Sequence, residues 1–361
     1  MTLPIALDYR PALLSPAGIG RATRELAKAL AAREDLELHL FGHSLARARQ
    51  AVSVPERARL HRLPIPGRSL PALAQLGLGA DRLAGGARVF HWTDYVQPPV
   101  VRASAVLTVH DLAFVRDAAW HGADSESLRE RTKAAIARAA AVIVPSRTTA
   151  SDLRAFAPEA RSVHVVPFGA DHTPTAIATA HPLGGRPYAL CLGTIEPRKN
   201  HRTLLAAWRL LRAPRPLLVV VGQRGWECDE IVRDLEAGVQ AGLVEWHSDA
   251  ADAEVWSLLQ QAQLLVYPSL WEGFGFPPLE AMQLGVPVVA HDTAPMQELG
   301  DGALELVDAT DAAALADAIE RVQHDETLRA QRCQAGRTRA AAFRWRDCAA
   351  AHAVVYREVA S

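Results

Sequence analysis

Short apolar runs alternate with longer helical stretches along nearly the whole chain. Each run has the length of one buried strand, and helical periodicity fills several gaps between runs, as in residues 20–32 and 125–139. This alternation predicts an α/β fold with parallel sheets. In the first part of the chain, the predicted strands are residues 5–7, 36–41, 88–91, 105–109, 142–144 and 163–166.

The rhythm breaks once, at residues 169–187, which contain Pro, Gly, Thr and Ala without a clear period. A second series follows, with predicted strands at residues 188–192, 217–221, 243–247, 264–267, 286–290 and 303–307. A chain of 361 residues is longer than one usual domain. We therefore predict two doubly wound domains with ligands at the carboxyl ends of their strands. Their bounds are residues 1–170 and 188–342, joined by a linker at 171–187.

Segment 272–280 carries the most specific functional signal. It reads Glu-Gly-Phe-Gly-Phe-Pro-Pro-Leu-Glu, a glycine loop before a helix that begins at a proline. Such a loop brings backbone N–H groups to a helix N-terminus, which attracts phosphate and hydroxyl oxygens. The loop residues are Gly273, Phe274, Gly275 and Phe276. This arrangement suits a nucleotide sugar.

The two carboxylates of this segment divide the expected contacts. Glu272 precedes the helix and can accept hydrogen bonds from sugar hydroxyls, whereas Glu280, predicted in the first helical turn, can bind a vicinal diol such as ribose. Taken singly, Glu280 is equally explained by the helix dipole and Glu272 by solvation of a loop acid. The complete pattern of strand, glycine loop and helix favours the binding role.

Two adjacent cations, Arg198 and Lys199, follow the strand predicted at residues 188–192. A leaving diphosphate needs positive charge close to its oxygens. An exposed basic turn is the alternative. Placement at a strand end opposite the glycine loop favours diphosphate binding.

A second glycine turn lies near the N-terminus, where Gly18 and Gly20 lead into a helix. Glycine lets the backbone approach a phosphate closely, although a simple tight turn explains the same pattern. A nicotinamide-dependent oxidoreductase is the leading rival enzyme class. It would require an acidic residue after the second strand, but that strand runs into Gly42, so the ribose acid is missing.

His110 ends the strand predicted at residues 105–109. Its imidazole can hydrogen-bond to a sugar hydroxyl; the alternative is that it serves only to fix a turn. His91 with Asp94, and His121, lie near similar predicted turns and are candidates to face an acceptor.

The composition excludes several other functions. A formal net charge of -1 argues against general nucleic-acid binding. The four cysteines show no paired spacing, no metal-ligand pattern is present, and the N-terminus lacks a basic secretory region. These features predict a cytoplasmic enzyme without a metal. The arginines within residues 47–68 predict either contact with anionic lipid or a solvated surface.

Taken together, the motifs resemble those of the family 4 retaining glycosyltransferases with the GT-B fold. Four segments carry the resemblance: 18–21, 110–112, 193–200 (Gly-Thr-Ile-Glu-Pro-Arg-Lys-Asn) and 267–282. It extends over essentially the whole chain. It implies two Rossmann-like domains facing a central cleft, with residues 343–361 forming a helix that packs back on the first domain.

The resemblance implies transfer of a sugar from a nucleoside diphosphate to an acceptor hydroxyl, with retention of configuration and no metal or other cofactor. Glu272 and His110 would contact the donor sugar, Glu280 the ribose, and Lys199 the diphosphate. Loop 273–276 would bind the sugar and phosphate, while Gly18 and Gly20 would approach the phosphates and acceptor.

One position departs from the family pattern. Many members carry arginine immediately after the first glycine of segment 193–200, where this chain has Thr194. Arg198 is therefore the expected second cation.

The motifs are most similar to those of bacterial mannosyltransferases of surface polysaccharide assembly, which implies GDP-mannose as donor. A dTDP-rhamnose or UDP-sugar transferase is the alternative within the fold, and a non-catalytic sugar-nucleotide-binding protein is the alternative outside enzymes. The acceptor implied is a saccharide or lipid-linked oligosaccharide at the inner membrane face, with the protein in the cytoplasm or peripherally bound there.

Overall fold

The computed structural model describes residues 2–15, 18–44, 53–117, 120, 125–175 and 181–361. The chain divides into two compact units. Unit 1 comprises Met1–Val115, Asp124–Gly169 and Arg344–Ser361, and unit 2 comprises Arg116–Ala123 and Ala170–Phe343. The C-terminal segment therefore returns to the first unit, as predicted.

The division differs from the predicted domains in two places. Arg116, Asp117 and Trp120 group with unit 2, where the indole N–H of Trp226 donates to the carbonyl oxygen of Trp120 at 2.6 Å. The described residues of the predicted linker, 171–175 and 181–187, also group with unit 2. Tertiary contacts of this kind leave no mark in local composition.

Unit 1 contains a seven-stranded sheet in the order β3-β2-β1-β4-β5-β6-β7, and all its strand pairs are parallel. The central strands are buried on both faces, which explains why they read as continuous apolar runs. The strands are β1 (Leu3–Asp8), β2 (Leu36–His43), β3 (Ala58–Leu63), β4 (Val89–Trp92), β5 (Ser104–Thr108), β6 (Ala141–Val144) and β7 (Val163–Val165).

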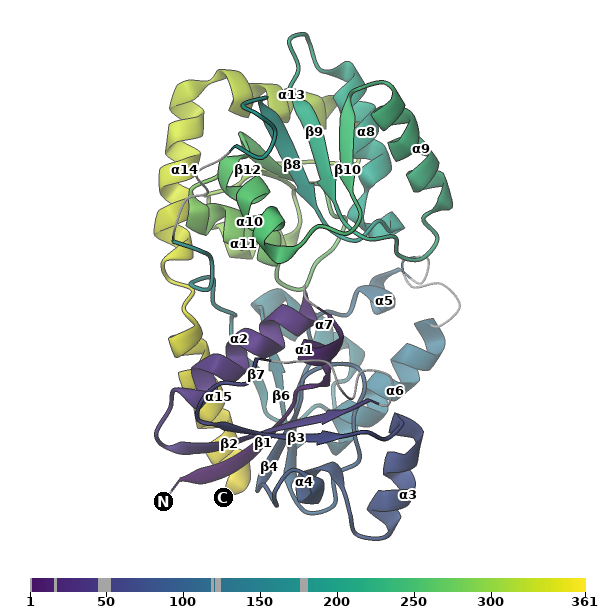
Figure 1. Ribbon diagram of the computed structural model, residues 1–361, viewed down its shortest axis with the longest axis vertical. Coiled ribbons are helices and arrows are strands. Elements are labelled where there is room, and N and C mark those ends of the chain that lie inside the picture. The colour runs from purple at the N-terminus through teal and green to yellow at the C-terminus, as the bar shows by residue number, and fades with distance from the viewer. Residues whose placement is uncertain (1, 16–17, 45–52, 118–119, 121–124, 176–180) are drawn as a thin grey trace. The chain divides into compact units, whose positions relative to one another are not determined.

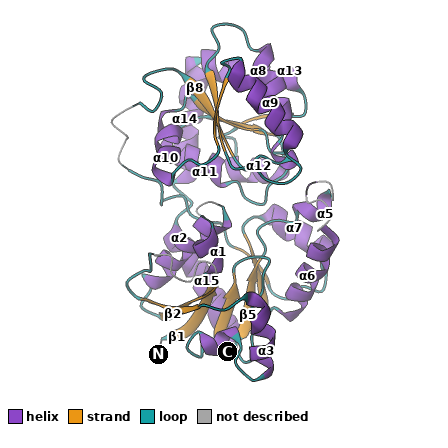
Figure 2. Cartoon of the chain, turned by 45° about the vertical axis from the view of Figure 1, so that its right-hand side comes forward, coloured by secondary structure: helices purple, strands orange, loops and turns teal. Residues whose placement is uncertain are grey.

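Helices cover both faces of this sheet (Figures 1 and 2). One layer contains α1, α2 and α15, and the opposite layer packs Leu70, Ile136 and Leu153 against the strands. The helices are α1 (Arg10–Leu14), α2 (Ile19–Ala31), α3 (Leu70–Gln75), α4 (Ala80–Leu83), α5 (Ala113–Arg116), α6 (Ser125–Arg138), α7 (Arg147–Phe156) and α15 (Trp345–Ala360), with a 3-10 turn η1 (Gly67–Ser69).

Unit 2 contains a six-stranded sheet in the order β10-β9-β8-β11-β12-β13, again with parallel pairs. Its strands are β8 (Tyr188–Leu192), β9 (Leu217–Val221), β10 (Val244–His247), β11 (Leu264–Tyr267), β12 (Val288–His291) and β13 (Glu305–Val307). The predicted starts of β12 and β13 were two residues early, because Val286, Ala303 and Leu304 are buried apolar residues that lie outside the paired registers.

Two helical layers also enclose the second sheet. Helices α8, α9 and α13 share a core with one face, and α10, α11 and α14 lie on the other (Figures 1 and 2). The helices are α8 (His201–Leu210), α9 (Asp229–Gln240), α10 (Asp252–Gln261), α11 (Phe276–Leu284), α12 (Ala294–Gly300), α13 (Ala312–His324) and α14 (Glu326–Ala340), with a 3-10 turn η4 (Pro197–Lys199).

The strand order reverses at one point in each sheet. In unit 1 this point lies between β1 and β4, and in unit 2 it lies between β8 and β11. Doubly wound sheets bind ligands beside the carboxyl ends of the strands at such a point. The loops that follow these four strands are therefore the first place to look for function.

Candidate active site

Lys199 and Glu272 meet at the reversal point of the second sheet. Lys199 ends the η4 turn that follows β8, and Glu272 lies in the loop that follows β11. The Lys199 ammonium donates to the Glu272 carboxylate, and also to the Tyr267 hydroxyl at 3.3 Å. Only 13% of the Lys199 side chain and 12% of the Glu272 side chain are exposed. The two predicted site residues thus form one nearly buried ion pair.

Arg198 is tied into the same cluster through several contacts. Its Nη1 donates to the carbonyl oxygen of Trp271 at 2.6 Å and lies 3.2 Å from Oε1 of Glu272. Its Nη2 forms an ion pair with Oε1 of Glu196 at 2.8 Å. Arg198 therefore holds two loops together in addition to supplying charge.

The cluster fixes the charge state of Glu272. Burial alone would raise the pKa of this carboxyl, but Lys199 and Arg198 lower it, and the net pKa is about 2. The Ser269 hydroxyl, which donates to Oε1 of Glu272 at 2.6 Å, acts in the same direction. Glu272 is accordingly ionised at neutral pH. Burial raises the pKa of Glu196, against the opposing effect of Arg198.

Asn200 anchors the turn that carries both cations. Its backbone is left-handed, with φ of 57°, and its amide donates to the carbonyl oxygens of Ala309 at 2.8 Å and Pro268 at 3.3 Å. The hydroxyl of Thr203 donates to its side-chain oxygen at 2.7 Å. These bonds fix Lys199 relative to the end of β11.

Thr194 provides no charge at the position where the family resemblance implies arginine. It is exposed, and a Cβ at Gly225 would lie 2.8 Å from its methyl carbon. The positive charge in this part of unit 2 therefore comes from Arg198 and Lys199.

The glycine loop turns the chain sharply into α11. Gly275, the N-cap, has φ of +98°, and a Cβ there would lie 2.6 Å from Cε of Met296. Glycine is required for both reasons. The helix begins at Phe276, so Pro277 and Pro278 occupy its second and third positions and not the predicted first one. The rings of Phe274 and Phe276 meet edge to face at 5.5 Å.

Glu280 lies in the second turn of α11, not in the first as expected, because the helix already begins at Phe276. Its carboxylate is buried and accepts a hydrogen bond from Nε2 of His172 at 3.0 Å. The helix dipole falls off within the first turn. The helix dipole is thus a poor explanation for an acid in the second turn.

In unit 1, His110 lies beside the end of β4. Its Nε2 donates to the carbonyl oxygen of Thr93 at 2.8 Å, and its ring stacks on Phe168 with centroids 5.6 Å apart. Burial lowers the pKa of His110, more than the Thr93 carbonyl and nearby acids raise it. The ring is therefore neutral, and with Nε2 protonated its Nδ1 is a hydrogen-bond acceptor. His110 fixes a turn and retains an atom suited to a sugar hydroxyl.

Gly18 and Gly20 have different local roles. Gly18 is the N-cap of α2 with φ of +55°. Gly20 lies inside the helix, where a Cβ would be 2.1 Å from the carbonyl oxygen of Ser15. Close packing of α1 against α2 thus accounts for Gly20, whether or not a phosphate binds nearby.

The interpretation of His91 as an acceptor-facing residue is wrong. His91 lies within β4, fully buried, and hydrogen-bonds to the hydroxyls of Tyr356 and Thr108, each at 2.7 Å. Asp94 is instead ion-paired with Arg10 at the reversal point of the first sheet. His121 lies outside the described residues.

Within the described residues, no group of three or more His, Cys, Asp or Glu side chains is arranged to hold a metal ion. The four cysteines are free. None of the helices in the described ranges is long and apolar enough to cross a membrane.

Two families match consecutive parts of the chain. The glycosyl transferase 4-like domain matches residues 17–169, and the glycosyl transferases group 1 family matches residues 176–339. O-antigen chain mannosyltransferase B of Escherichia coli is 31% identical over 359 residues, covering 92% of this chain and 93% of that protein. The chain belongs to the glycosyltransferases. Its fold is GT-B.

Another relative of this glycosyltransferase is the MMP alpha-(1->4)-mannosyltransferase of Mycolicibacterium hassiacum, 30% identical over 60% of this chain and 53% of that protein. Among solved structures, sucrose-phosphate synthase of Thermosynechococcus elongatus superposes with a TM-score of 0.80 at 23% identity, covering 99% of both chains. HepE of Anabaena, in complex with UDP and glucose, gives 0.75 at 17% identity with the same coverage. These two structures support the fold alone.

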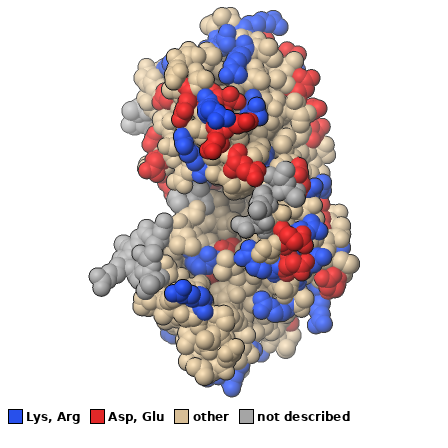
Figure 3. Space-filling model, turned by 90° about the vertical axis from the view of Figure 1, so that its right-hand side faces the viewer, with Lys and Arg blue, Asp and Glu red and all other residues tan. Residues whose placement is uncertain are grey.

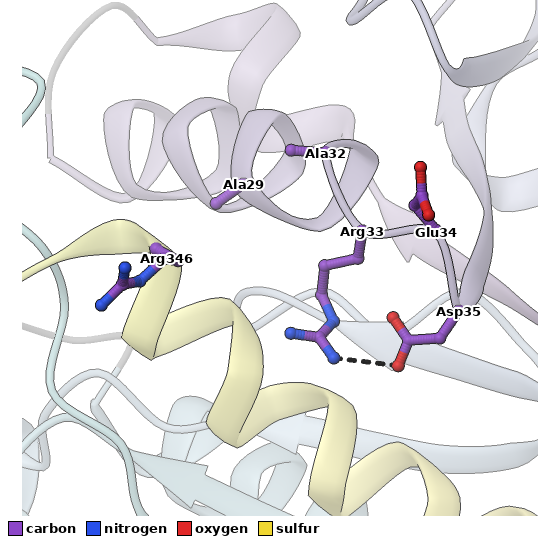
Figure 4. Close-up of a pocket in the computed structure, with 6 residues that line it drawn as sticks. All are labelled: Ala29, Ala32, Arg33, Glu34, Asp35 and Arg346. Atoms are coloured by element: carbon purple, nitrogen blue, oxygen red, sulfur yellow. Dashed lines mark hydrogen bonds and ion pairs between the residues drawn. The ribbon is translucent and has the colours of Figure 1, made fainter.

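The glycosyltransferase also has a pocket of about 380 Å³ beside the end of α2 and the start of α15 in unit 1 (Figure 4). None of the predicted site residues lines it. Its charged groups neutralise each other, since Arg33 points to Asp35 with Nη2 and Oδ2 2.9 Å apart. Basic and acidic side chains are likewise mixed on the face shown in Figure 3.

The structure brings Arg198, Lys199 and Glu272 together in unit 2, with Glu280 on the following helix, while His110, Gly18 and Gly20 belong to unit 1. Sequence reasoning did not single out Tyr267, Ser269, Asn200 or His172. The first three lie within the motif segments 193–200 and 267–282, so their position was a usable signal. His172 lies in the region interpreted as linker and gave none.

Proposed function

We propose that this glycosyltransferase transfers an α-mannosyl residue from GDP-mannose, with retention of configuration, to a saccharide or lipid-linked oligosaccharide in bacterial surface polysaccharide synthesis. The observation that carries the proposal is the buried cluster of Lys199, Arg198 and ionised Glu272 at the reversal point of a doubly wound sheet. The names of the O-antigen and MMP mannosyltransferases support mannose as the sugar.

In the proposed reaction, the bond between the anomeric carbon and the diphosphate oxygen breaks. The acceptor oxygen bonds to the same face of that carbon, and its proton passes to the leaving phosphate oxygen. No enzymatic base is required. Lys199 and Arg198 would stabilise the charge that develops on the diphosphate.

Glu272 would accept hydrogen bonds from hydroxyls of the donor sugar. Its low pKa supports this role, because an ionised carboxylate can only accept. Nδ1 of neutral His110 would accept a hydrogen bond from a further hydroxyl of the sugar. Since the cations of the protein supply the positive charge, we propose that no metal is needed.

The donor can be tested with a binding and hydrolysis panel of GDP-mannose, dTDP-rhamnose, UDP-glucose, UDP-N-acetylglucosamine and NAD, each with and without EDTA. Stabilisation by GDP-mannose, with slow release of GDP that EDTA does not change, is expected. Preference for another sugar nucleotide would replace the donor but keep the reaction class. Binding without hydrolysis or transfer would indicate a sugar-nucleotide-binding protein instead.

Retention requires a separate measurement. NMR of the product formed from α-configured donor should show an α-linked sugar. A β-linked product would contradict the front-face mechanism, whatever the donor.

For the acceptor, we propose a peripheral membrane contact through unit 1. Leu76 is 77% exposed, and Leu78 and Val101 are exposed nearby. The backbone amides of Val101 and Arg102 both donate to the Asp81 carboxylate. These bonds hold the loop that contains Val101 against α4, the helix that follows Leu78 in the chain. Three arginines close to these residues in the chain, Arg68, Arg82 and Arg102, are exposed as well. Apolar side chains beside arginines suit an anionic lipid surface.

This surface shares Arg68 with the predicted segment, residues 47–68, but otherwise lies on later parts of the chain. Residues 45–52 lie outside the described part, and residues 58–63 form edge strand β3. Wild type should sediment with phosphatidylglycerol vesicles and not with phosphatidylcholine vesicles. Leu76→Asp should abolish sedimentation, and equal sedimentation of the variant would contradict the proposal.

A further inference from the structure

His172 was not among the predicted site residues, yet it is in direct contact with Glu280, the residue expected to bind the donor ribose. Its Nε2 is 3.0 Å from Oε1 of Glu280, and only 5% of the His172 side chain and 2% of the Glu280 side chain are exposed. The carboxylate can only accept, so the imidazole donates. A charged group this deeply buried depends on such donors for its position.

The surrounding residues fix the imidazole in place. Two aromatic rings meet it nearly at right angles, Trp256 of α10 at 5.7 Å and Phe276 of α11 at 6.3 Å between centroids. The backbone on either side is also tied down within unit 2. The amide of Ala170 donates to the carbonyl oxygen of Phe343 at 2.9 Å, and the Gln260 side chain donates to that of Pro174 at 3.3 Å.

This geometry determines which way the Glu280 carboxylate faces. A carboxylate that must accept from two neighbouring hydroxyls needs a defined plane. A hydrogen bond from a rigid neighbour sets that plane, as outer partners orient the ligands of a metal. Loss of the donor would leave Glu280 in place on α11 but remove a hydrogen bond that orients its carboxylate.

We propose that His172 is a positioning residue, which orients Glu280 to accept the 2′- and 3′-hydroxyls of the donor ribose. It thereby sets a preference for ribonucleoside over 2′-deoxyribonucleoside diphosphates. The inference rests on the proposed function, because Glu280 meets a ribose only if the donor is a nucleotide sugar.

The test measures dissociation constants of the full-length protein for two matched pairs of probes, GDP with 2′-deoxy-GDP and UDP with 2′-deoxy-UDP. Hydrogen bonds to a charged group are worth enough for a preference of about tenfold or more for the ribose form. In His172→Phe, which keeps a ring and removes the donor, the preference should fall to about twofold. The loss should lie in binding of the ribose form, with affinity for the deoxy form unchanged.

Two further variants separate positioning from packing. The amide nitrogen of His172→Gln reaches close to the original Nε2, so the ribose preference should be retained. His172→Asn is too short to reach, and the preference should be lost. His324→Phe, at the exposed end of α13, is the matched control and should behave as wild type.

The outcomes distinguish the inference from the function on which it rests. A folded His172→Phe variant with the full wild-type preference for the ribose form would overturn the inference alone. A wild-type protein that binds the ribose and deoxyribose forms equally would do the same. If His172→Phe does not fold, equal preferences in the Gln and Asn variants would overturn it. A wild type that binds no nucleotide or nucleotide sugar would overturn the proposed function as well.

Discussion

Lys199 and Glu272 are 73 residues apart in the chain, and the ammonium of one donates directly to the carboxylate of the other. The pair joins the loop after β8 to the loop after β11, the two strands at which the sheet order reverses. Each residue is thereby held in place before any ligand binds. A donor would enter a site whose charges are already oriented, which is the condition for strong electrostatic catalysis.

Replacement of Lys199 should reduce catalysis far more than folding. We expect Lys199→Ala to lower turnover roughly 10²- to 10³-fold, because a preoriented charge at the leaving group is lost. Arg198 and Ser269 still contact Glu272, so the loop should stay ordered. Transfer rates should be measured on protein whose folding is confirmed by circular dichroism.

Lys28→Ala is the matched control for this experiment. Lys28 is an exposed lysine of α2 that forms an ion pair with Glu25, its neighbour on the same helix. Such a surface pair contributes little, so its removal should leave turnover unchanged. Turnover within tenfold of wild type in folded Lys199→Ala would contradict the role assigned to Lys199.

Arg198 should behave differently, because it holds the structure as well as supplying charge. We expect Arg198→Ala to lower the free energy of unfolding by about 3 kcal/mol, since removal of one partner leaves buried Glu196 uncompensated. Turnover should fall too. Urea unfolding of the Arg198 and Lys199 variants, compared side by side, provides the measurement. An Arg198→Ala variant as stable as Lys199→Ala would show that the Trp271 and Glu196 contacts are not structural.

Most of the fold follows from local pattern. Strands buried on both faces produce unbroken apolar runs, so β1, β8 and β11 were predictable from sequence. Strand β3 was not, because an edge strand with partly exposed arginines has the composition of a polar loop. Helix α14 was also missed, since its sequence is largely polar and only a few small residues are buried.

The site was predictable where chemistry and spacing coincide. Glu272 and Lys199 stand out because their residue types match a nucleotide sugar and they follow strand ends. His172 could not be found in this way, since its partner Glu280 is 108 residues away and no local pattern links them. His91 was misassigned for the opposite reason. It reads as a polar strand end, whereas burial by the distant C-terminal helix decides its role.

The glycine loop provides a test of backbone conformation. Gly275→Ala introduces a Cβ at φ of +98° and within 2.6 Å of Met296. We expect a loss of about 3 kcal/mol in the free energy of unfolding, from left-handed strain and overpacking combined. Donor affinity should fall as well, because the start of α11 shifts.

Gly302→Ala separates the two causes. Gly302 also has a positive φ, +86°, but a Cβ there meets nothing within 4 Å. Gly302→Ala should lower the free energy of unfolding by about 1 kcal/mol, from backbone strain alone, and should leave donor affinity unchanged. Thermal and urea unfolding of both variants, together with donor titration, measure the difference. Equal losses would show that contact with Met296 is accommodated.

A buried pair of histidines should make unit 1 sensitive to acid. The ring of His352 in α15 lies 5.5 Å from that of His91, centroid to centroid, in a tilted arrangement. Its Nδ1 donates to the carbonyl oxygen of Cys348, and burial lowers its pKa to about 4. Burial also lowers the pKa of His91, with a further contribution from His352. The Tyr356 hydroxyl faces the same pair, and burial keeps its pKa well above the usual range, so it stays neutral.

Proton uptake by the unfolded chain determines whether acid stabilises or destabilises the fold. An unfolded histidine has a pKa of about 6.5, so between that value and about 4 the unfolded chain binds a proton that folded His352 does not. Stability is therefore complete above about pH 6.5 and declines as the pH falls toward 4. For His352 alone, we expect a loss of roughly 2 kcal/mol between pH 7.5 and pH 5.

His352→Phe removes the titrating group but keeps a ring of similar shape in the cluster. The difference in free energy of unfolding between pH 7.5 and pH 5, measured with urea, should be smaller in this variant by that amount. His324→Phe, at an exposed position, should retain the wild-type difference. If His352→Phe loses as much stability on acidification as wild type, His352 is not the source of the acid sensitivity, and His91 becomes the residue to replace.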